Sequence, residues 1–70
     1  MPQIESPLTG RILSVLVTEG DAVTPSMSLM LIESMKMEIP LEAEVSGVVA
    51  KVLVAAGDEV SEGQALLTLS

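Results

Sequence analysis

The chain repeats itself, and this internal repeat limits the folds that it can adopt. When residues 6–33 of the 70-residue chain are placed over residues 43–70, at an offset of 37, eight positions are identical. The identical pairs are Gly10/Gly47, Val15/Val52, Leu16/Leu53, Val17/Val54, Gly20/Gly57, Asp21/Asp58, Val23/Val60 and Leu29/Leu66. The repeated Gly-Asp pair marks a turn in each copy. We therefore expect one domain, residues 1–70, built from two copies of a small β unit.

The apolar runs of the two copies have the length of strands rather than of helices. They cover residues 11–17, 29–33, 37–43, 48–54 and 66–69. Gly20 and Gly57 lie between runs, where a glycine can adopt the positive φ that a tight reversal needs. Two such units predict an all-β fold, a flattened antiparallel barrel or sandwich whose halves are related by a pseudo-twofold axis.

Side-chain alternation in the first run of each copy predicts which residues face the core. Successive side chains of a strand point to opposite faces. Three successive positions of one parity in each run are apolar, whereas Ser14 and Lys51 have the other parity. The apolar residues are Leu13, Val15 and Val17 with their counterparts Ala50, Val52 and Val54. We expect these residues to face the core, although Leu16 and Leu53 break the alternation.

Composition excludes several classes of function. Ten acidic residues against three basic ones give a net charge of −7, which would repel a phosphate backbone, and no aromatic ring is present on which a base could stack. The chain has neither cysteine nor histidine, so it lacks thiolate chemistry and the commonest general base. We expect no nucleic-acid binding and no independent enzyme activity.

The apolar runs are also far shorter than the roughly 20 residues that span a bilayer as a helix. The N-terminal residues Met1 to Glu5 contain no basic residue of the kind that opens a secretory signal. We therefore expect a cytoplasmic protein without a membrane-spanning segment.

The segment that joins the two copies contains an isolated lysine, Lys36, between Met35 and Met37. If this segment were a continuous strand, both methionines would face the core and Lys36 would be an ordinary surface lysine. If it reverses direction, Lys36 lies at a hairpin tip and the methionines form an exposed, adaptable apolar surface for a partner. The position between the repeats favours the hairpin.

The joining segment and its flanks together resemble the biotin carboxyl carrier family, whose usual motif is Ala-Met-Lys-Met or Ser-Met-Lys-Met with biotin on the lysine. The stretches that carry the resemblance are Glu33-Ser34-Met35-Lys36-Met37-Glu38-Ile39, Pro7-Leu8-Thr9-Gly10, Gly20-Asp21-x-Val23, Gly57-Asp58-x-Val60 and Gly63-Gln64-x-Leu66. The lysine motif placed between two Gly-Asp-x-Val turns indicates this family more specifically than the motif alone.

The resemblance implies a barrel-sandwich hybrid of two four-stranded antiparallel sheets, with the lysine on an exposed β-hairpin and both chain ends at the opposite edge. It implies covalent biotin on Lys36, attached by a biotin protein ligase, with Met35 and Met37 as recognition residues and Glu33 and Ser34 flanking the tip. Biotin carboxylase and a carboxyltransferase would then act on the arm. The domain itself would be a carrier without an active site.

Two other functions share this pattern. A lipoyl carrier has the same fold and lysine placement, but its usual motif is Asp-Lys-Ala rather than Met-Lys-Met. An adaptor module could retain the fold without any modification.

Two features depart from the family pattern. Ser26 stands where the second copy has Gly63, so we expect that turn to be reshaped. The protruding thumb and the long Ala/Pro-rich linker of some members are also missing from this sequence.

Overall fold

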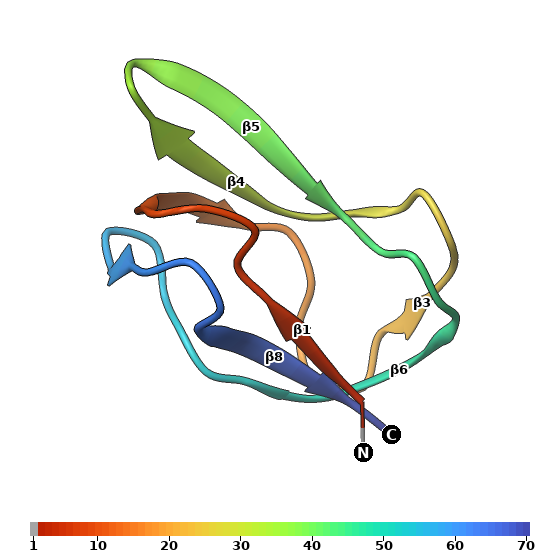
Figure 1. The fold of residues 1–70 in the computed structure, drawn as a ribbon. Coiled ribbons are helices and arrows are strands. Elements are labelled where there is room, and N and C mark those ends of the chain that lie inside the picture. Colours follow the sequence, from red (N-terminus) through yellow and green to blue (C-terminus); the bar gives the residue numbers. More distant parts are fainter. Residues whose placement is uncertain (1) are drawn as a thin grey trace.

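The computed structural model describes residues 2–70, which form short strands joined by tight turns (Figure 1). The strands are β1 (Gln3–Glu5), β2 (Gly10–Val15), β3 (Ala22–Val23), β4 (Ser28–Ser34), β5 (Met37–Glu42), β6 (Gly47–Val52), β7 (Glu59–Val60) and β8 (Ala65–Leu69). The five longer strands match the apolar runs of the sequence. The three short strands β1, β3 and β7 have no apolar run that would reveal them.

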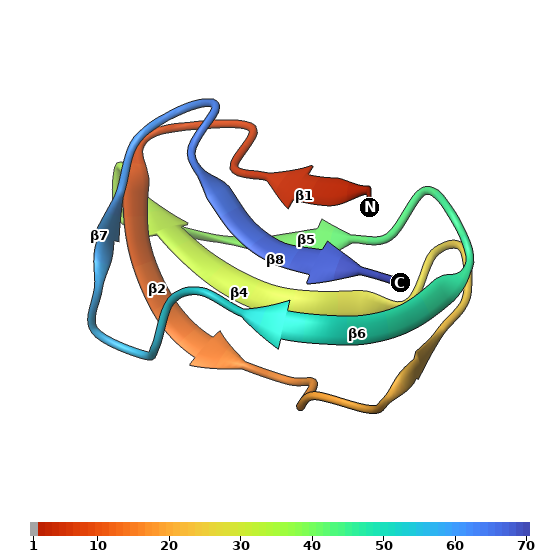
Figure 2. The same cartoon turned by 90° about the horizontal axis from the view of Figure 1, so that it is seen from below.

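The strands form two four-stranded sheets in which all pairs are antiparallel. One sheet has the order β1-β8-β6-β3 and the other has the order β5-β4-β2-β7. Figure 2 shows β6 and β8 of the first sheet lying across β4 and β2 of the second. The expected all-β fold of two four-stranded antiparallel sheets is confirmed. None of the described residues belongs to a helix long and apolar enough to cross a membrane.

The pseudo-twofold relation between the copies extends to individual hydrogen bonds. The amide of Gly20 donates to the carbonyl of Val49 at 2.8 Å, and the amide of Gly57 donates to the carbonyl of Ile12, 37 positions from Val49, at 2.7 Å. The Asp side chain of each Gly-Asp turn also accepts an equivalent backbone N–H, at 2.8 Å in the first copy and 2.9 Å in the second. In each copy, the Gly-Asp turn is thus hydrogen-bonded to the first long strand of the other copy.

The core lies between the two sheets and is built from aliphatic side chains. Its buried residues are Ile12, Val17, Val23, Leu29, Met30, Ile32, Leu41, Ala43, Val49, Val60, Leu66, Leu67 and Leu69. Ser6 is buried with them, and its hydroxyl donates to the carbonyl of Leu8 at 2.6 Å. Because the chain has no aromatic ring, these aliphatic side chains fill the core by interlocking with one another.

The prediction of which side chains face the core is wrong at the start of the first run in each copy. Ile12 and Val49 are buried there, whereas Leu13 and Ala50 are only half-buried. The strand register shifts between Ile12 and Ser14 in β2 and at the equivalent place in β6. A bulge of this kind inserts one unpaired residue and reverses the parity beyond it.

Beyond each bulge the predicted parity is partly recovered. Val17 is buried, and Val15, Val52 and Val54 are half-buried and pack against the core. The two leucines that break the alternation point outward. Leu16 is 51% exposed and Leu53 is 47% exposed.

Equivalent turns of the two copies have similar backbone conformations. Gly20 and Gly57 adopt φ values of 94° and 96°, which confirms the predicted positive-φ reversals. The expected reshaping at Ser26 is wrong, because Ser26 has a φ of 73° against 86° at its counterpart Gly63. The same hydrogen bond also fixes both turns, since each amide donates at 2.8 Å to the equivalent residue, Ala43 or Ser6. Serine therefore adopts the left-handed conformation that the fold imposes.

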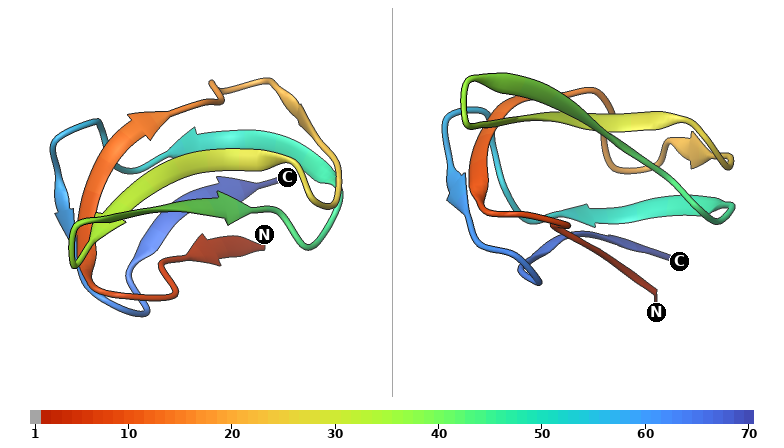
Figure 3. Two further views of the ribbon diagram at one scale, coloured as in Figure 1. Left: turned by 90° about the horizontal axis from the view of Figure 1, so that it is seen from above. Right: turned by 45° about the horizontal axis from the view of Figure 1, so that its top comes forward.

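The hairpin of β4 and β5 extends to the upper left of Figure 1, away from the two chain ends at the lower right. The right-hand view of Figure 3 shows the same separation. The joining segment of the two copies therefore lies well away from the termini.

Candidate functional site

The two-residue turn of the β4–β5 hairpin consists of Met35 and Lys36. Strand pairing continues to Ser34 and Met37, which lie opposite each other at the end of the ladder. Met35 and Lys36 have φ values of 53° and 64°. A two-residue hairpin loop with positive φ at both positions is a type I′ turn, which normally contains Asn-Gly or similar residues. The turn thus holds two ordinary L-residues in a conformation that they rarely adopt.

Side chains at this turn are directed into solvent. Met35 is 91% exposed and Met37 is 61% exposed, and Lys36 is exposed between them. The two methionines do not face the core, so the continuous-strand interpretation is wrong and the hairpin interpretation is confirmed. By contrast, Met30 of the same β4 strand is fully buried.

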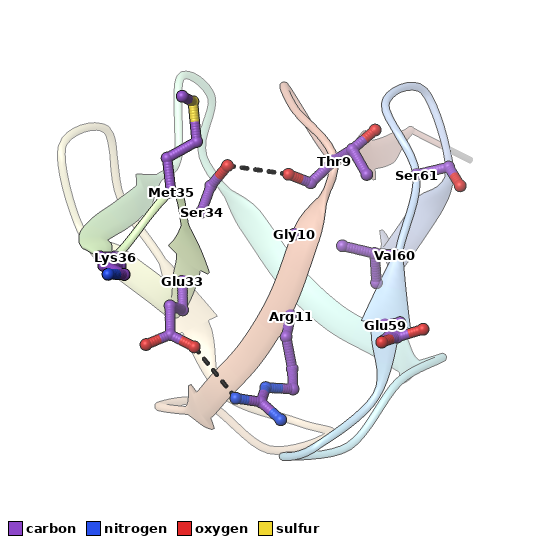
Figure 4. A pocket seen from close by; sticks show the side chains of 10 residues that line it. All are labelled: Thr9, Gly10, Arg11, Glu33, Ser34, Met35, Lys36, Glu59, Val60 and Ser61. Atoms are coloured by element: carbon purple, nitrogen blue, oxygen red, sulfur yellow. Dashed lines mark hydrogen bonds and ion pairs between the residues drawn. The ribbon is translucent and has the colours of Figure 1, made fainter.

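Two polar contacts join the hairpin, close to its turn, to the neighbouring β2 region. The hydroxyl of Ser34 donates to the carbonyl of Thr9 at 2.9 Å. The guanidinium Nη2 of Arg11 lies 3.0 Å from Oε1 of Glu33. Both contacts are visible in Figure 4. They place Glu33 and Ser34, the predicted flanking residues, in the stem of the hairpin rather than at its tip.

Gly10 allows the stem to approach β2 closely. A Cβ atom at this position would overlap the backbone carbonyl oxygen of Glu33. Sequence reasoning did not identify Thr9 or Arg11 as part of the site, because their contact with the hairpin depends on strand register. The repeated Gly10/Gly47 pair was the only local signal of this close approach.

An open groove of about 910 Å³ runs beside the hairpin and across β2 towards β7 (Figure 4). Arg11 and Lys36 supply positive charge to its lining, and Glu33 and Glu59 supply negative charge. Residues 2–70 contain no cluster of three or more His, Cys, Asp or Glu side chains that could hold a metal ion. The chemical group that this site presents is therefore a primary amine on an exposed, sharply defined turn.

Comparisons with known proteins agree with this geometry. Residues 1–69 match the model of the biotin/lipoyl family, which is described as "Biotin-requiring enzyme". The chain belongs to the biotin/lipoyl attachment family. It is 43% identical over 63 residues to a biotin/lipoyl attachment protein of Bacillus subtilis, covering 90% of this chain and 86% of that protein. It is 40% identical over 65 residues to a biotin carboxyl carrier protein of Streptococcus mutans, covering 93% of this chain and 50% of that protein.

Solved structures that superpose on this chain include part of a carboxylase and a lipoyl domain. The urea carboxylase of Kluyveromyces lactis contains a region that superposes with a TM-score of 0.91 at 32% identity, covering 99% of this chain and 6% of that one. The lipoyl domain of the 2-oxoglutarate dehydrogenase complex of Azotobacter vinelandii superposes with a TM-score of 0.82 at 26% identity, covering 100% of this chain and 96% of that one. This chain therefore has the fold of an attachment domain, and it spans half or less of some of the proteins that it matches.

Proposed function

We propose that this attachment domain is a biotin carboxyl carrier, with biotin joined as an amide to Nζ of Lys36. The observation that carries the proposal is the position of Lys36. It occupies the second residue of a type I′ turn, between two exposed methionines, at the junction of two equivalent β units. The sequence Ser34-Met35-Lys36-Met37 at this turn agrees with the biotin motif of the family.

The residues present fit an amide-linked cofactor. Within residues 2–70, the only ion pair shorter than 4 Å joins Arg11 and Glu33, so no carboxylate holds the amine of Lys36. The unbranched side chain projects from a turn rather than lying along a strand. A ligase could therefore reach the amine, which displaces the leaving group from the activated carboxyl group of biotin and loses a proton. The product no longer carries the positive charge of the lysine.

Lys36 also supplies length and mobility to the attached group. When bound, biotin supplies the ureido nitrogen that accepts and releases a carboxyl group. A tether that keeps this ring near two active sites raises its effective concentration at both. The hairpin is fixed next to its turn by the contact of Ser34 with Thr9 and the contact of Glu33 with Arg11, so the protein defines where the arm begins and leaves the arm itself free.

The proposed partners are a biotin protein ligase, a biotin carboxylase and a carboxyltransferase. The urea carboxylase match supports the two carboxylase partners, because this chain superposes on a small part of that much longer chain. The domain contributes position rather than catalysis, and the reaction takes place at its partners.

A lipoyl carrier is the second candidate, and the close superposition on a lipoyl domain favours it. The two candidates differ at the turn. The methionines beside Lys36 are typical of biotin attachment, whereas lipoyl domains usually have Asp-Lys-Ala. Coexpression with a biotin ligase and, separately, with a lipoyl ligase, followed by intact mass measurement, distinguishes them.

The test of the site is peptide mapping of the modified protein. We expect biotin on Lys36 alone and no biotin on Lys51, an exposed lysine within strand β6 that provides an internal control. Lys36→Arg keeps the charge but offers a guanidinium, which is always protonated and is not acylated. This variant should lose all biotin while its free energy of unfolding changes by no more than about 0.5 kcal/mol. Biotin on Lys51, or on the variant, would contradict the assignment.

A further inference from the structure

The four methionines within residues 2–70 occupy two contrasting environments. Met30 is fully buried in the core and Met27 is half-buried against it. Met35 and Met37 are 91% and 61% exposed, on either side of Lys36. Because the chain contains no cysteine, the thioethers are its only sulfur groups. The accessible sulfur described in residues 2–70 is thus concentrated at the tip that carries the reactive amine.

We propose that Met35 and Met37 form a peroxide-sensitive site that controls modification of Lys36. Each thioether sulfur attacks one oxygen of a peroxide and breaks the O–O bond. The sulfur is oxidised to a sulfoxide and the peroxide is reduced to water or an alcohol. Methionine sulfoxide can be reduced again enzymatically, so the change is reversible. This inference rests on the proposed carrier function, since it concerns access of a ligase to Lys36.

Oxidation at the tip should leave the fold unchanged. Neither Met35 nor Met37 belongs to the core, and the side-chain contacts that fix the hairpin next to its turn come from Ser34 and Glu33. The backbone pairing of Met37 with Ser34 does not involve the thioether. A sulfoxide at either position therefore remains in solvent and disrupts no packing.

Oxidation should nevertheless change recognition of the tip. A protein that reaches Nζ of Lys36 approaches a turn with an exposed thioether on each side. Thioethers are apolar and adaptable, whereas sulfoxides are polar and have a strong oxygen acceptor. A contact surface shaped for the thioether would have to bury this polar oxygen. We expect ligation to slow by about tenfold or more, which corresponds to about 1.4 kcal/mol of lost binding to the reacting complex.

The chemical part of the test is a time course with hydrogen peroxide on the folded protein, read by peptide mass. We expect one oxygen atom on Met35 and one on Met37 before Met27, with Met30 unmodified until the protein is unfolded by denaturant. The urea midpoint of the doubly oxidised protein should equal that of the untreated protein. Oxidation of Met30 at the same rate as Met35 in folded protein would overturn the proposal.

The functional part compares initial biotinylation rates before and after oxidation. The double variant Met35→Leu/Met37→Leu keeps apolar side chains without sulfur, so peroxide should leave its rate unchanged. Met30→Leu is the matched control, and it should lose activity with peroxide just as the original chain does. Treatment with both methionine sulfoxide reductases should restore the rate of the oxidised original chain.

The outcomes separate this inference from the carrier proposal. If the untreated protein accepts no biotin, the proposed function fails, and the oxidation order remains measurable by mass. If the untreated protein accepts biotin and its oxidised form does so at the same rate, the inference about Met35 and Met37 is wrong while the carrier proposal stands.

Discussion

Relief of backbone strain at the β4–β5 turn should stabilise the domain and impair its modification. Met35 has a φ of 53°, in the left-handed region. This conformation costs an ordinary L-residue about 1–2 kcal/mol, whereas Asn adopts it more readily. Met35 is 91% exposed, so little packing is lost when it is replaced. We therefore expect Met35→Asn to raise the free energy of unfolding by about 0.5–1 kcal/mol.

The size of this effect is measurable in a domain of 70 residues, whose total stability is expected to be about 3.5–10 kcal/mol. Because the chain has no aromatic residue, urea unfolding is followed by far-UV circular dichroism rather than by fluorescence. The m-value should be unchanged, since the surface exposed on unfolding is nearly the same. On the same samples, we expect the initial rate of biotinylation to fall, because the substitution removes a thioether that we propose the ligase recognises.

Ser26→Gly is the matched control for strain. Ser26 is exposed, has a φ of 73°, and lies in a turn away from the hairpin tip. Glycine relieves the strain but loses more entropy on folding, by roughly 0.5–1 kcal/mol. The net gain should be about 0.5 kcal/mol, with no change in the biotinylation rate. A Met35→Asn protein that is less stable, or one that is biotinylated at the original rate, would refute the view that the turn trades stability for recognition.

Two further substitutions and one insertion test the scaffold. Gly10→Ala should destabilise the domain by about 1–3 kcal/mol in urea unfolding, because its Cβ would overlap the Glu33 carbonyl and push β2 away from the hairpin stem. Gly20→Val should cost at least about 1–2 kcal/mol, although a Cβ meets no atom within 4 Å there, because a β-branched residue is strained at a φ of 94°. A Gly-Ser insertion after Ser34 should cost less than about 1 kcal/mol but greatly slow biotinylation in a ligase time course, and an unfolded or normally modified insertion mutant would contradict the role of the tight turn.

Much of the fold could be predicted because the repeat presents the same local signals twice. A Gly-Asp pair specifies a turn through local chemistry, and the observed φ values at Gly20 and Gly57 agree to within 2°. The bulges in β2 and β6 could not be predicted, because a bulge is a mismatch between two strands that are distant in the sequence. Short strands such as β3 and β7 are likewise defined by their partners rather than by their own two residues.

The candidate site also has features that the sequence predicts and features that depend on distant partners. The exposure of Lys36 and its neighbours was predictable because they interrupt the repeat, and a repeat boundary is where the chain must reverse. The contacts of Thr9 and Arg11 were not, since each joins residues more than 20 positions apart. Ser26 shows the limit of reasoning from residue type, because the hydrogen bonds of the second copy's turn recur in the first despite the loss of glycine.

The pseudo-twofold relation explains why the turn at Lys36 and the chain ends lie apart. Leu31 pairs with Pro40 in the hairpin, and 37 positions away Thr68 pairs with Gln3, between β8 and β1. Strands β4 and β5 are therefore equivalent to β8 and β1, and the turn at Lys36 is equivalent to the gap between the two termini. Symmetry places this gap and the turn in corresponding positions of opposite sheets. Gln3 and Leu69 therefore lie away from Lys36, and the groove beside β2 leaves one side of the Lys36 turn open.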